Sequence, residues 1–449
     1  MKFVARSGRS DKHSLRFHLS MLCKKRSPRR RPCHKKLAPR LLLSLSLFTN
    51  GTSTTVIPTN TTANVTAEFA SNLTPIRLIV ANDCAESIWP GILTQNGAGP
   101  GTGGFELTPG ASRLMFVSSN WAGRVWGRTN CSFSSDGSEF GTSNGLDGNA
   151  TACLTGDCVG KLNCTLAGRA PATVAEFTLQ GGSTDNQTFY DISLVDGYNL
   201  PMAIIYYPSP NTTWIPPNLT NCACIASAGY LSSSPYSSPT APLDSASYLN
   251  TNSTYPMPFE PIQTNNTVQA WCPVALQVPA TNPVAAGDNA TIISNPDNGN
   301  PLTPHRAPFQ PCLSPCAVTK NPADCCTGPY NSPDVCKPGL YSRSAKRVCP
   351  DAYSFAYDDR TSTFVVPYET AGAGWEVRFC PRGRSTDILR TFGEEVQAVG
   401  AGTGLSLEGW ARVRSWAYIE QRETGWTGAG MVVRGSAWTA VVGLVVVMV

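Results

Sequence analysis

Three carboxylates lie near one another in the sequence, in two short apolar segments. Glu176 is part of "ATVAEFTLQ", and Asp191 and Asp196 are part of "FYDISLVDG". A glycosidase uses two such groups, one protonated to donate a proton and one ionised to attack the sugar or to activate water. Two carboxylates held close together repel, which raises the pKa of one of them. Glycoside hydrolysis is therefore the chemistry that these residue types allow, provided that the chain brings them together.

Both segments have the alternation of β-strands, and this alternation predicts where the acids point. Successive side chains of a strand face opposite sides, and the segment "GGSTDNQ" can close a hairpin between the two strands. A turn centred near Ser183 sets Glu176 opposite Asp191, about 5 Å apart across an antiparallel pair. Strict alternation places Asp196 on the other face unless Gly197 allows a bulge or turn. The simpler alternative is that each acid is a solvated strand or turn residue.

Short apolar runs bounded by turn-forming residues continue along the chain. They include "PIRLIVAN", "SRLMFVSS" and "PMAIIYYP", and the chain holds 39 Gly and 36 Pro. This pattern predicts a mainly β fold, a β-sandwich of many short strands. Residues 225–271 and 278–311 are rich in Ser, Pro and Asn and are expected to form long loops. Residues 313–351 are expected to form a disulfide-held segment with little regular core.

The N-terminal residues have the composition of a secretory leader. Residues 1–40 carry a net charge of +13, so the other 409 residues sum to −8 although the whole chain is +5. A short apolar run, Leu41–Phe48, follows. We therefore expect a basic leader and signal peptide over residues 1–53 and a secreted, acidic mature protein that does not bind nucleic acid. A basic arm on a cytosolic protein is the alternative.

Sequons and cysteines also favour secretion. The chain has 13 N-x-S/T sequons and 17 cysteines, of which 15 follow the leader. Disulfides are the better interpretation of these cysteines because only four His residues are available to suggest zinc sites. Residues 54–74 are rich in Thr and Asn and are expected to form a glycosylated linker. The sequons lie at Asn50, Asn60, Asn64, Asn72, Asn130, Asn149, Asn163, Asn186, Asn211, Asn218, Asn252, Asn265 and Asn289.

The C-terminal part differs in composition from the rest. Residues 382–430 are rich in Arg, Gly and Trp and are expected to form a tail of low order, in which "ILRTFGEEVQAV" can make a short helix. Residues 431–449 form a hydrophobic C-terminal segment that ends in the largely apolar run "AWTAVVGLVVVMV". Small residues upstream of this segment suit a signal for a GPI-type lipid anchor. A short membrane-seeking end is the alternative.

Three motifs resemble the thaumatin-like family, in the family's order. They are "CLTGDC" (Cys153–Cys158), "DGYNLPM" and "CPDAYSFAYDD", and the resemblance covers residues 75–381. It implies a flattened antiparallel β-sandwich with disulfide-rich loop subdomains. Two departures are "NATA" just before Cys153, where the family usually has glycines, and a longer loop after Cys224.

The resemblance also implies a disulfide pattern. One family cysteine is missing where this chain reads "VVPYET", so Cys222 is expected to be a free thiol, although Cys222 and Cys224 could exchange roles opposite Cys349. The expected pairs are Cys84–Cys380, Cys131–Cys153, Cys158–Cys164, Cys224–Cys349, Cys272–Cys312, Cys316–Cys325 and Cys326–Cys336.

The resemblance further implies an acidic cleft that binds β-1,3-glucan. Matched by motif, Glu176 is the acid/base and Asp191 its partner, Arg169 positions the sugar, and Asp196 and Asp351 contact substrate. Family members are associated with glucan binding, with weak endo-β-1,3-glucanase activity in some, and with antifungal defence. For this chain we expect a secreted monomer at the cell wall or cell surface that binds more readily than it hydrolyses, in wall remodelling or antifungal defence.

The alternative is a non-catalytic, wall- or membrane-tethered protein that recognises a protein partner or inhibits a glycosidase. No cofactor and no metal are expected, because the chain has no P-loop, H-E-x-x-H or calcium-loop pattern.

Overall fold

A computed structural model describes most of the chain from Pro75 to Glu423. Side chains are described as far as Ser415. The leader, the Thr/Asn-rich linker and the segment 431–449 lie outside the described residues. The described ranges are 75–134, 151–210, 213–227, 248–261, 268–278, 311–369, 371–381 and 383–423.

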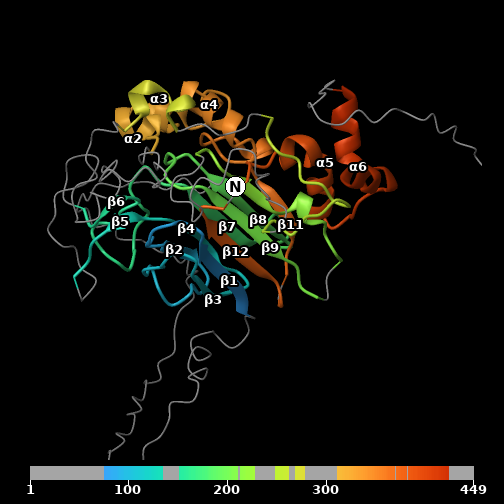
Figure 1. The fold of residues 1–449 in the computed structure, drawn as a ribbon, viewed down its shortest axis with the longest axis horizontal. Coiled ribbons are helices and arrows are strands. Elements are labelled where there is room, and N and C mark those ends of the chain that lie inside the picture. Colours follow the sequence, from blue (N-terminus) through green and yellow to red (C-terminus); the bar gives the residue numbers. More distant parts are fainter. Residues whose placement is uncertain are drawn as a thin grey trace, which may run out of the picture. The chain divides into compact units, whose positions relative to one another are not determined.

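Two five-stranded sheets form the body of the fold (Figure 1). Neighbouring strands are antiparallel except for the parallel pair of β1 and β12. The predicted mainly β, antiparallel architecture is confirmed. The first sheet has the order β10 (Cys222–Cys224), β9 (Met202–Tyr207), β12 (Gly374–Phe379), β1 (Pro75–Asn82) and β3 (Ser112–Ser118). The second has the order β11 (Phe364–Pro367), β8 (Gln187–Ser193), β7 (Val174–Gly181), β4 (Ala122–Trp126) and β2 (Gly91–Asn96).

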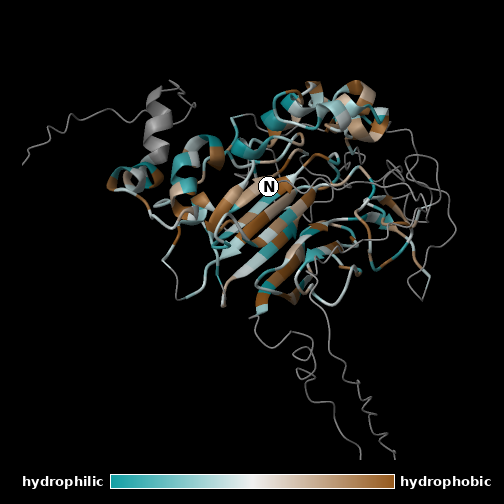
Figure 2. Cartoon of the chain, turned by 180° about the vertical axis from the view of Figure 1, so that it is seen from behind, coloured by the Kyte–Doolittle hydropathy of each residue, from teal (hydrophilic) through white to brown (hydrophobic). Residues whose placement is uncertain are grey.

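The core lies between the two sheets and is rich in aromatic side chains. Trp375 of the first sheet contacts Phe177 and Tyr190 of the second, with ring centroids 5.6 and 4.5 Å apart. Tyr206, a neighbour of Trp375 within the first sheet, lies at 4.7 Å. Hydrophobic and hydrophilic residues alternate along the strands (Figure 2), because one face of each sheet packs inward and the other does not.

In the part of the chain that the structure describes, seven disulfides join the strands and loops, and their pairs are the expected ones. Cys224, and not Cys222, pairs with Cys349. Cys222 is a buried free thiol in β10. Cys131–Cys153 joins the small sheet of β5 (Thr129–Cys131) and β6 (Cys153–Thr155).

The disulfide-bonded segment that follows residue 311 is mostly short helices. It contains α2 (Pro315–Thr319), α3 (Pro322–Cys325) and α4 (Leu340–Val348). Ser314 and Asn321 cap α2 and α3 by accepting backbone N–H groups. The 3-10 helices of the fold are η1 (Pro217–Leu219), η2 (Val268–Ala270), η3 (Val274–Leu276), η4 (Gly328–Tyr330) and η5 (Asp359–Thr361).

The segment expected to be a tail of low order contains two helices. Helix α5 (Ile388–Gly400) forms where a short helix was expected, and α6 (Leu407–Glu423) was not expected. Helix α5 is amphipathic, and its apolar side chains are buried in the main core because they recur on one face. The helix packs on β11 (Figure 1), and Thr386 just before it hydrogen-bonds Ala223 of β10. Since β10 and β11 are edge strands, the segment covers edges that a sandwich otherwise leaves open.

Among the described residues, none of the helices combines the length and apolar character needed to span a bilayer.

Candidate functional site

Glu176 and Asp191 are direct neighbours on the second sheet. Strand β7 pairs with β8 in the register that sets Glu176 opposite Asp191. Their sequence neighbours Phe177 and Tyr190 contact Trp375 in the core. Because side chains alternate, both acids lie on the outer face of the sheet. This is the arrangement that strand alternation predicts.

A third strand adds an arginine that the sequence did not assign to the site. Arg124 of β4 is the register partner of Glu176, and its Nη2 lies 2.7 Å from Glu176 Oε1. The exposed fractions of the two side chains are 12% and 33%. We call Arg124, Glu176 and Asp191 the charged row. The signal in the sequence is the alternation in "AGRVW", which places Arg124 on the face opposite the buried Val125.

Arg169, the arginine that the resemblance assigned, lies in an exposed loop. Its backbone N–H donates to the carbonyl of Asp157 at 2.7 Å. The strand register that aligns the charged row does not include it. The arginine that pairs with Glu176 is Arg124.

Asp196 lies in the turn after β8 and interacts electrostatically with the charged row. Burial raises the pKa of its carboxyl, the positive charge of Arg124 lowers it, and the negative charge of Glu176 raises it. The turn depends on Gly197, which has φ +94°, and a Cβ there would lie 2.5 Å from the carbonyl oxygen of Cys312. The bulge or turn that was expected at Gly197 is thus a turn in which Gly197 has a left-handed backbone conformation.

Asp351 has a structural task at the start of α5. Its carboxylate oxygens accept the backbone N–H groups of Ile388 and Leu389 at 2.9 and 2.8 Å. The side chain is buried, and this burial raises its pKa to about 6. Free N–H groups at a helix start need such acceptors. The structure thus joins Asp351 to α5 and does not show it in the charged row.

Two further elements border the charged row. Tyr353 forms a backbone bridge with Ser193, and burial, followed by the charge of Asp191, raises the pKa of its hydroxyl. Val365 of β11 is opposite Phe189 and therefore on the same face as Asp191. Gly400 of α5 packs closely on Val365. Helix α5 therefore bounds this face at its β11 edge.

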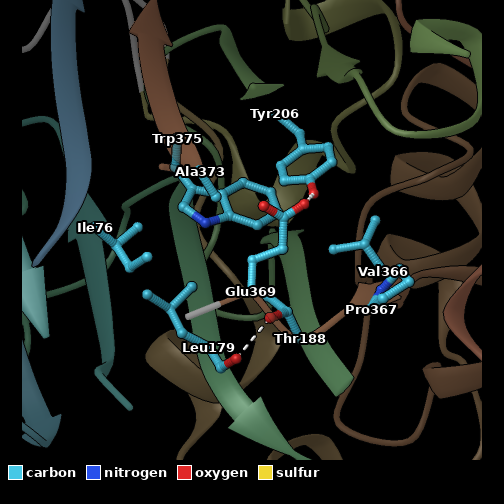
Figure 3. A pocket seen from close by; sticks show the side chains of 9 residues that line it. All are labelled: Ile76, Leu179, Thr188, Tyr206, Val366, Pro367, Glu369, Ala373 and Trp375. Atoms are coloured by element: carbon cyan, nitrogen blue, oxygen red, sulfur yellow. Dashed lines mark hydrogen bonds between the residues drawn. The ribbon is translucent and has the colours of Figure 1, made fainter. Parts of the chain in front are cut away.

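A pocket between the sheets is separate from the charged row (Figure 3). Within it Glu369 accepts hydrogen bonds from the hydroxyl of Tyr206 and from the backbone N–H of Ser209. Thr188 donates its hydroxyl to the carbonyl of Leu179 at 2.5 Å. None of the row residues lines this pocket, so the pocket and the charged row are different sites. Within the described ranges, no group of three or more His, Cys, Asp or Glu is arranged to hold a metal ion.

Known proteins match the part of the chain that carries most strands of both sheets. The family model described as "Thaumatin family" matches residues 82–381. A "Pathogenesis-related thaumatin-like protein 3.5" of Cryptomeria japonica is 34% identical over 304 residues, which cover 67% of this chain and 88% of the relative. "Pathogenesis-related protein 5" of Arabidopsis thaliana is 34% identical over 300 residues, with 67% and 88% covered. A solved thaumatin-like xylanase inhibitor is 30% identical over 29% of this chain and 75% of its own, with a TM-score of 0.22.

Proposed function

The chain belongs to the thaumatin family, and from this premise we propose that it is a secreted protein whose charged row binds β-1,3-glucan of a cell wall. The observation that carries the proposal is the alignment of Arg124, Glu176 and Asp191 across three adjacent strands. Such a row offers carboxylate acceptors and a guanidinium donor, spaced by the strand separation of about 4.8 Å. A sugar chain with its many hydroxyl groups can meet both kinds of group.

The charges of the site support a neutral partner. Glu176 and Asp191 outnumber the one arginine of the charged row, so anionic polymers such as nucleic acids are repelled. The charged row crosses three adjacent strands and so suits an extended ligand, whereas small-molecule sites are usually concave and mostly apolar. A polysaccharide therefore suits the site better than a small apolar ligand.

Hydrolysis is a second candidate, supported by the raised pKa of Asp196. A carboxyl whose pKa is raised by burial is the type of group that donates a proton to a leaving group. In this mechanism Glu176 or Asp191 acts as the ionised partner. Glu176 and Asp191 thus remain the proposed catalytic residues, with Asp196 a third candidate.

Secretion is supported by the chemistry of the cysteines. Seven disulfides are characteristic of an oxidising compartment. Four of the sequons, at Asn130, Asn163, Asn186 and Asn252, lie at exposed positions. We place the protein at the cell wall or cell surface, in defence or in wall remodelling.

A pull-down with insoluble β-1,3-glucan tests the proposal, together with an assay of reducing sugar released from laminarin. We expect wild type to bind and Glu176→Gln to bind at least about tenfold more weakly, as loss of a charged hydrogen-bonding group costs that much. Glu394→Gln, an exposed carboxylate on α5, is the matched control and should bind as wild type does. Equal binding by wild type and Glu176→Gln would remove the charged row from recognition. No binding by either would favour a protein partner.

A further inference from the structure

Asn218 is a sequon residue that the fold has buried. It begins the sequon Asn218–Leu219–Thr220 at η1, and its exposed fraction is 0%. Its Nδ2 donates to the carbonyl oxygens of Pro256 at 3.0 Å and of Val413 at 3.1 Å. The atom that would carry an N-linked glycan is therefore the atom that binds helix α6.

The orientation of the amide follows from its partners. Both neighbours are backbone carbonyls, which only accept hydrogen bonds, so the nitrogen and not the oxygen must face them. An asparagine amide has two N–H hydrogens, and the two bonds use both. No hydrogen on Nδ2 is left for a third group.

The contacts around Asn218 form a seat for α6. The ring of Trp410 on α6 is parallel to that of Trp214, with centroids 6.2 Å apart. Arg414 of α6 lies over the ring of Tyr255 at 5.9 Å. Val413, which directly precedes Arg414, is fully buried. We call Trp214, Asn218 and Tyr255 the α6 seat. Asn218 is its one buried hydrogen-bonding side chain.

Helix α6 is also tied to α5. Arg412 pairs with the buried Glu395 of α5 at 2.9 Å and donates to the carbonyl of Thr391 at 2.9 Å. Removing α6 from its seat would leave the Glu395 carboxylate without this cation. The position of α6 therefore matters to the helix that closes the edge of the sandwich.

We propose that Nδ2 of Asn218 has two mutually exclusive roles. It either carries an N-linked glycan or holds helix α6 in its seat by hydrogen bonds. The proposal rests on the secretory route inferred above. In glycan transfer Nδ2 attacks C1 of an oligosaccharide held on a lipid diphosphate. The N–C1 bond forms, the C1–O bond breaks, the lipid diphosphate leaves with the electron pair, and one amide proton is lost. One N–H remains, so at most one of the two hydrogen bonds survives, and the sugar has no room at a fully buried site.

The order of synthesis makes both outcomes accessible. Asn218 precedes Val413 by 195 residues. At 5–20 residues per second, the sequon is made about 10–40 s before the residue that covers it. During that interval nothing from α6 protects the amide. A glycan that is added during this interval prevents α6 from packing on Asn218 after α6 has been synthesised.

The test separates the sequon from the hydrogen bonds. The full chain is expressed in a glycosylating eukaryotic host, once with its own leader and once with a heterologous signal peptide. Thr220→Val removes the sequon and keeps the Asn218 amide, whereas Asn218→Gln removes the sequon and displaces the amide. Glycopeptide mapping reports occupancy, and limited trypsin digestion after Arg412 and Arg414 reports the seating of α6.

We expect Thr220→Val to be uniformly protected from trypsin and Asn218→Gln to be cut at least about tenfold faster, because buried partners lose their hydrogen bonds. Wild-type molecules with a glycan at Asn218 should be cut like Asn218→Gln, and those without should be protected like Thr220→Val. Protection of glycosylated molecules, or of Asn218→Gln, would overturn the proposal. Glycosylation of the exposed sequons reports secretion separately. If these sequons are occupied with the heterologous signal peptide but not with the native leader, the proposed secretion is wrong. The expression with the heterologous signal peptide then still tests the two roles of Asn218.

Discussion

Individual side chains acquire their roles here from the residues opposite them. Glu176 has Asp191 on one side and Arg124 on the other, so a like charge and an opposite charge act on the same carboxylate. Arg124 is mostly buried, and its Nε makes no hydrogen bond within the described residues. A guanidinium in this position depends on nearby carboxylates, above all on Glu176, for its compensation. Charge balance within the charged row is thus a matter of stability as well as of recognition.

Replacing Arg124 tests that balance. Arg124→Gln should lower the free energy of unfolding by about 1–3 kcal/mol, because the pair is partly buried and its loss leaves Glu176 beside Asp191 alone. Urea denaturation of Arg124→Gln, Glu176→Gln and the double variant forms a double-mutant cycle. The double variant should be more stable than the Arg124→Gln single variant. Strict additivity of the two single effects would show that the pair contributes nothing.

At the scale of elements, helix α5 connects the sandwich edge to the loop that carries Asp351. Thr386 hydrogen-bonds β10 just before the helix, the helix packs on β11, and Asp351 accepts the first N–H groups of the helix. The matched family region ends at residue 381, before these contacts begin. The chain therefore covers its open edge with residues that lie beyond that region.

The cap of α5 predicts a pH dependence of stability. Burial raises the pKa of Asp351 to about 6, so between pH 4 and pH 6 the folded protein keeps a proton that the unfolded chain has released. The contribution of this group is then fully present below its ordinary pKa of 3.8 and is lost as the pH rises through about 6. The limiting slope is about 1.4 kcal/mol per pH unit.

Chemical denaturation across this pH range provides the measurement. Asp351→Asn should lose this part of the pH dependence, and its stability deficit should be larger at pH 4 than at pH 6.5. Glu394→Gln, on the exposed side of the same helix, should follow wild type. A deficit that grows with pH would mean that the carboxylate form stabilises the folded state.

At the scale of the whole molecule, one disulfide joins the two ends of the matched domain. Cys84 after β1 and Cys380 after β12 are 296 residues apart, and β1 and β12 are adjacent parallel strands. The sheet register already brings these ends together, and the disulfide limits their separation in the unfolded chain. Six further disulfides constrain the same chain, so their effects overlap.

Removing the long-range disulfide should destabilise the protein without changing its fold. Chain-entropy estimates give an upper value of roughly 5–6 kcal/mol for Cys84→Ala/Cys380→Ala, and less when the other disulfides are intact.

Alkylation followed by mass measurement should find one free thiol in the mature domain, at Cys222. This thiol should react slowly in the folded protein and readily after denaturation. Two or more free thiols in wild type would contradict the seven pairs.

The sequence alone was enough for local relations and for the family. Period-2 alternation and one short turn set Glu176 against Asp191, because two strands joined by a hairpin have few available registers. The thaumatin-like motifs implied the seven disulfide pairs and the free thiol at Cys222, which the structure shows. These features depend on residues that are near in sequence or belong to a recognised pattern.

Relations between distant segments were decided only by the tertiary structure. Arg124 and Glu176 belong to strands whose adjacency alternation does not specify, and the family resemblance points to Arg169. Asp351 caps a helix that starts 37 residues later, and Asn218 is buried by a helix 195 residues away. The local sequence determines which hydrogen-bonding and charged groups a segment contains. Which of them are used depends on the partners that packing brings to it, and burial removes water as the default partner.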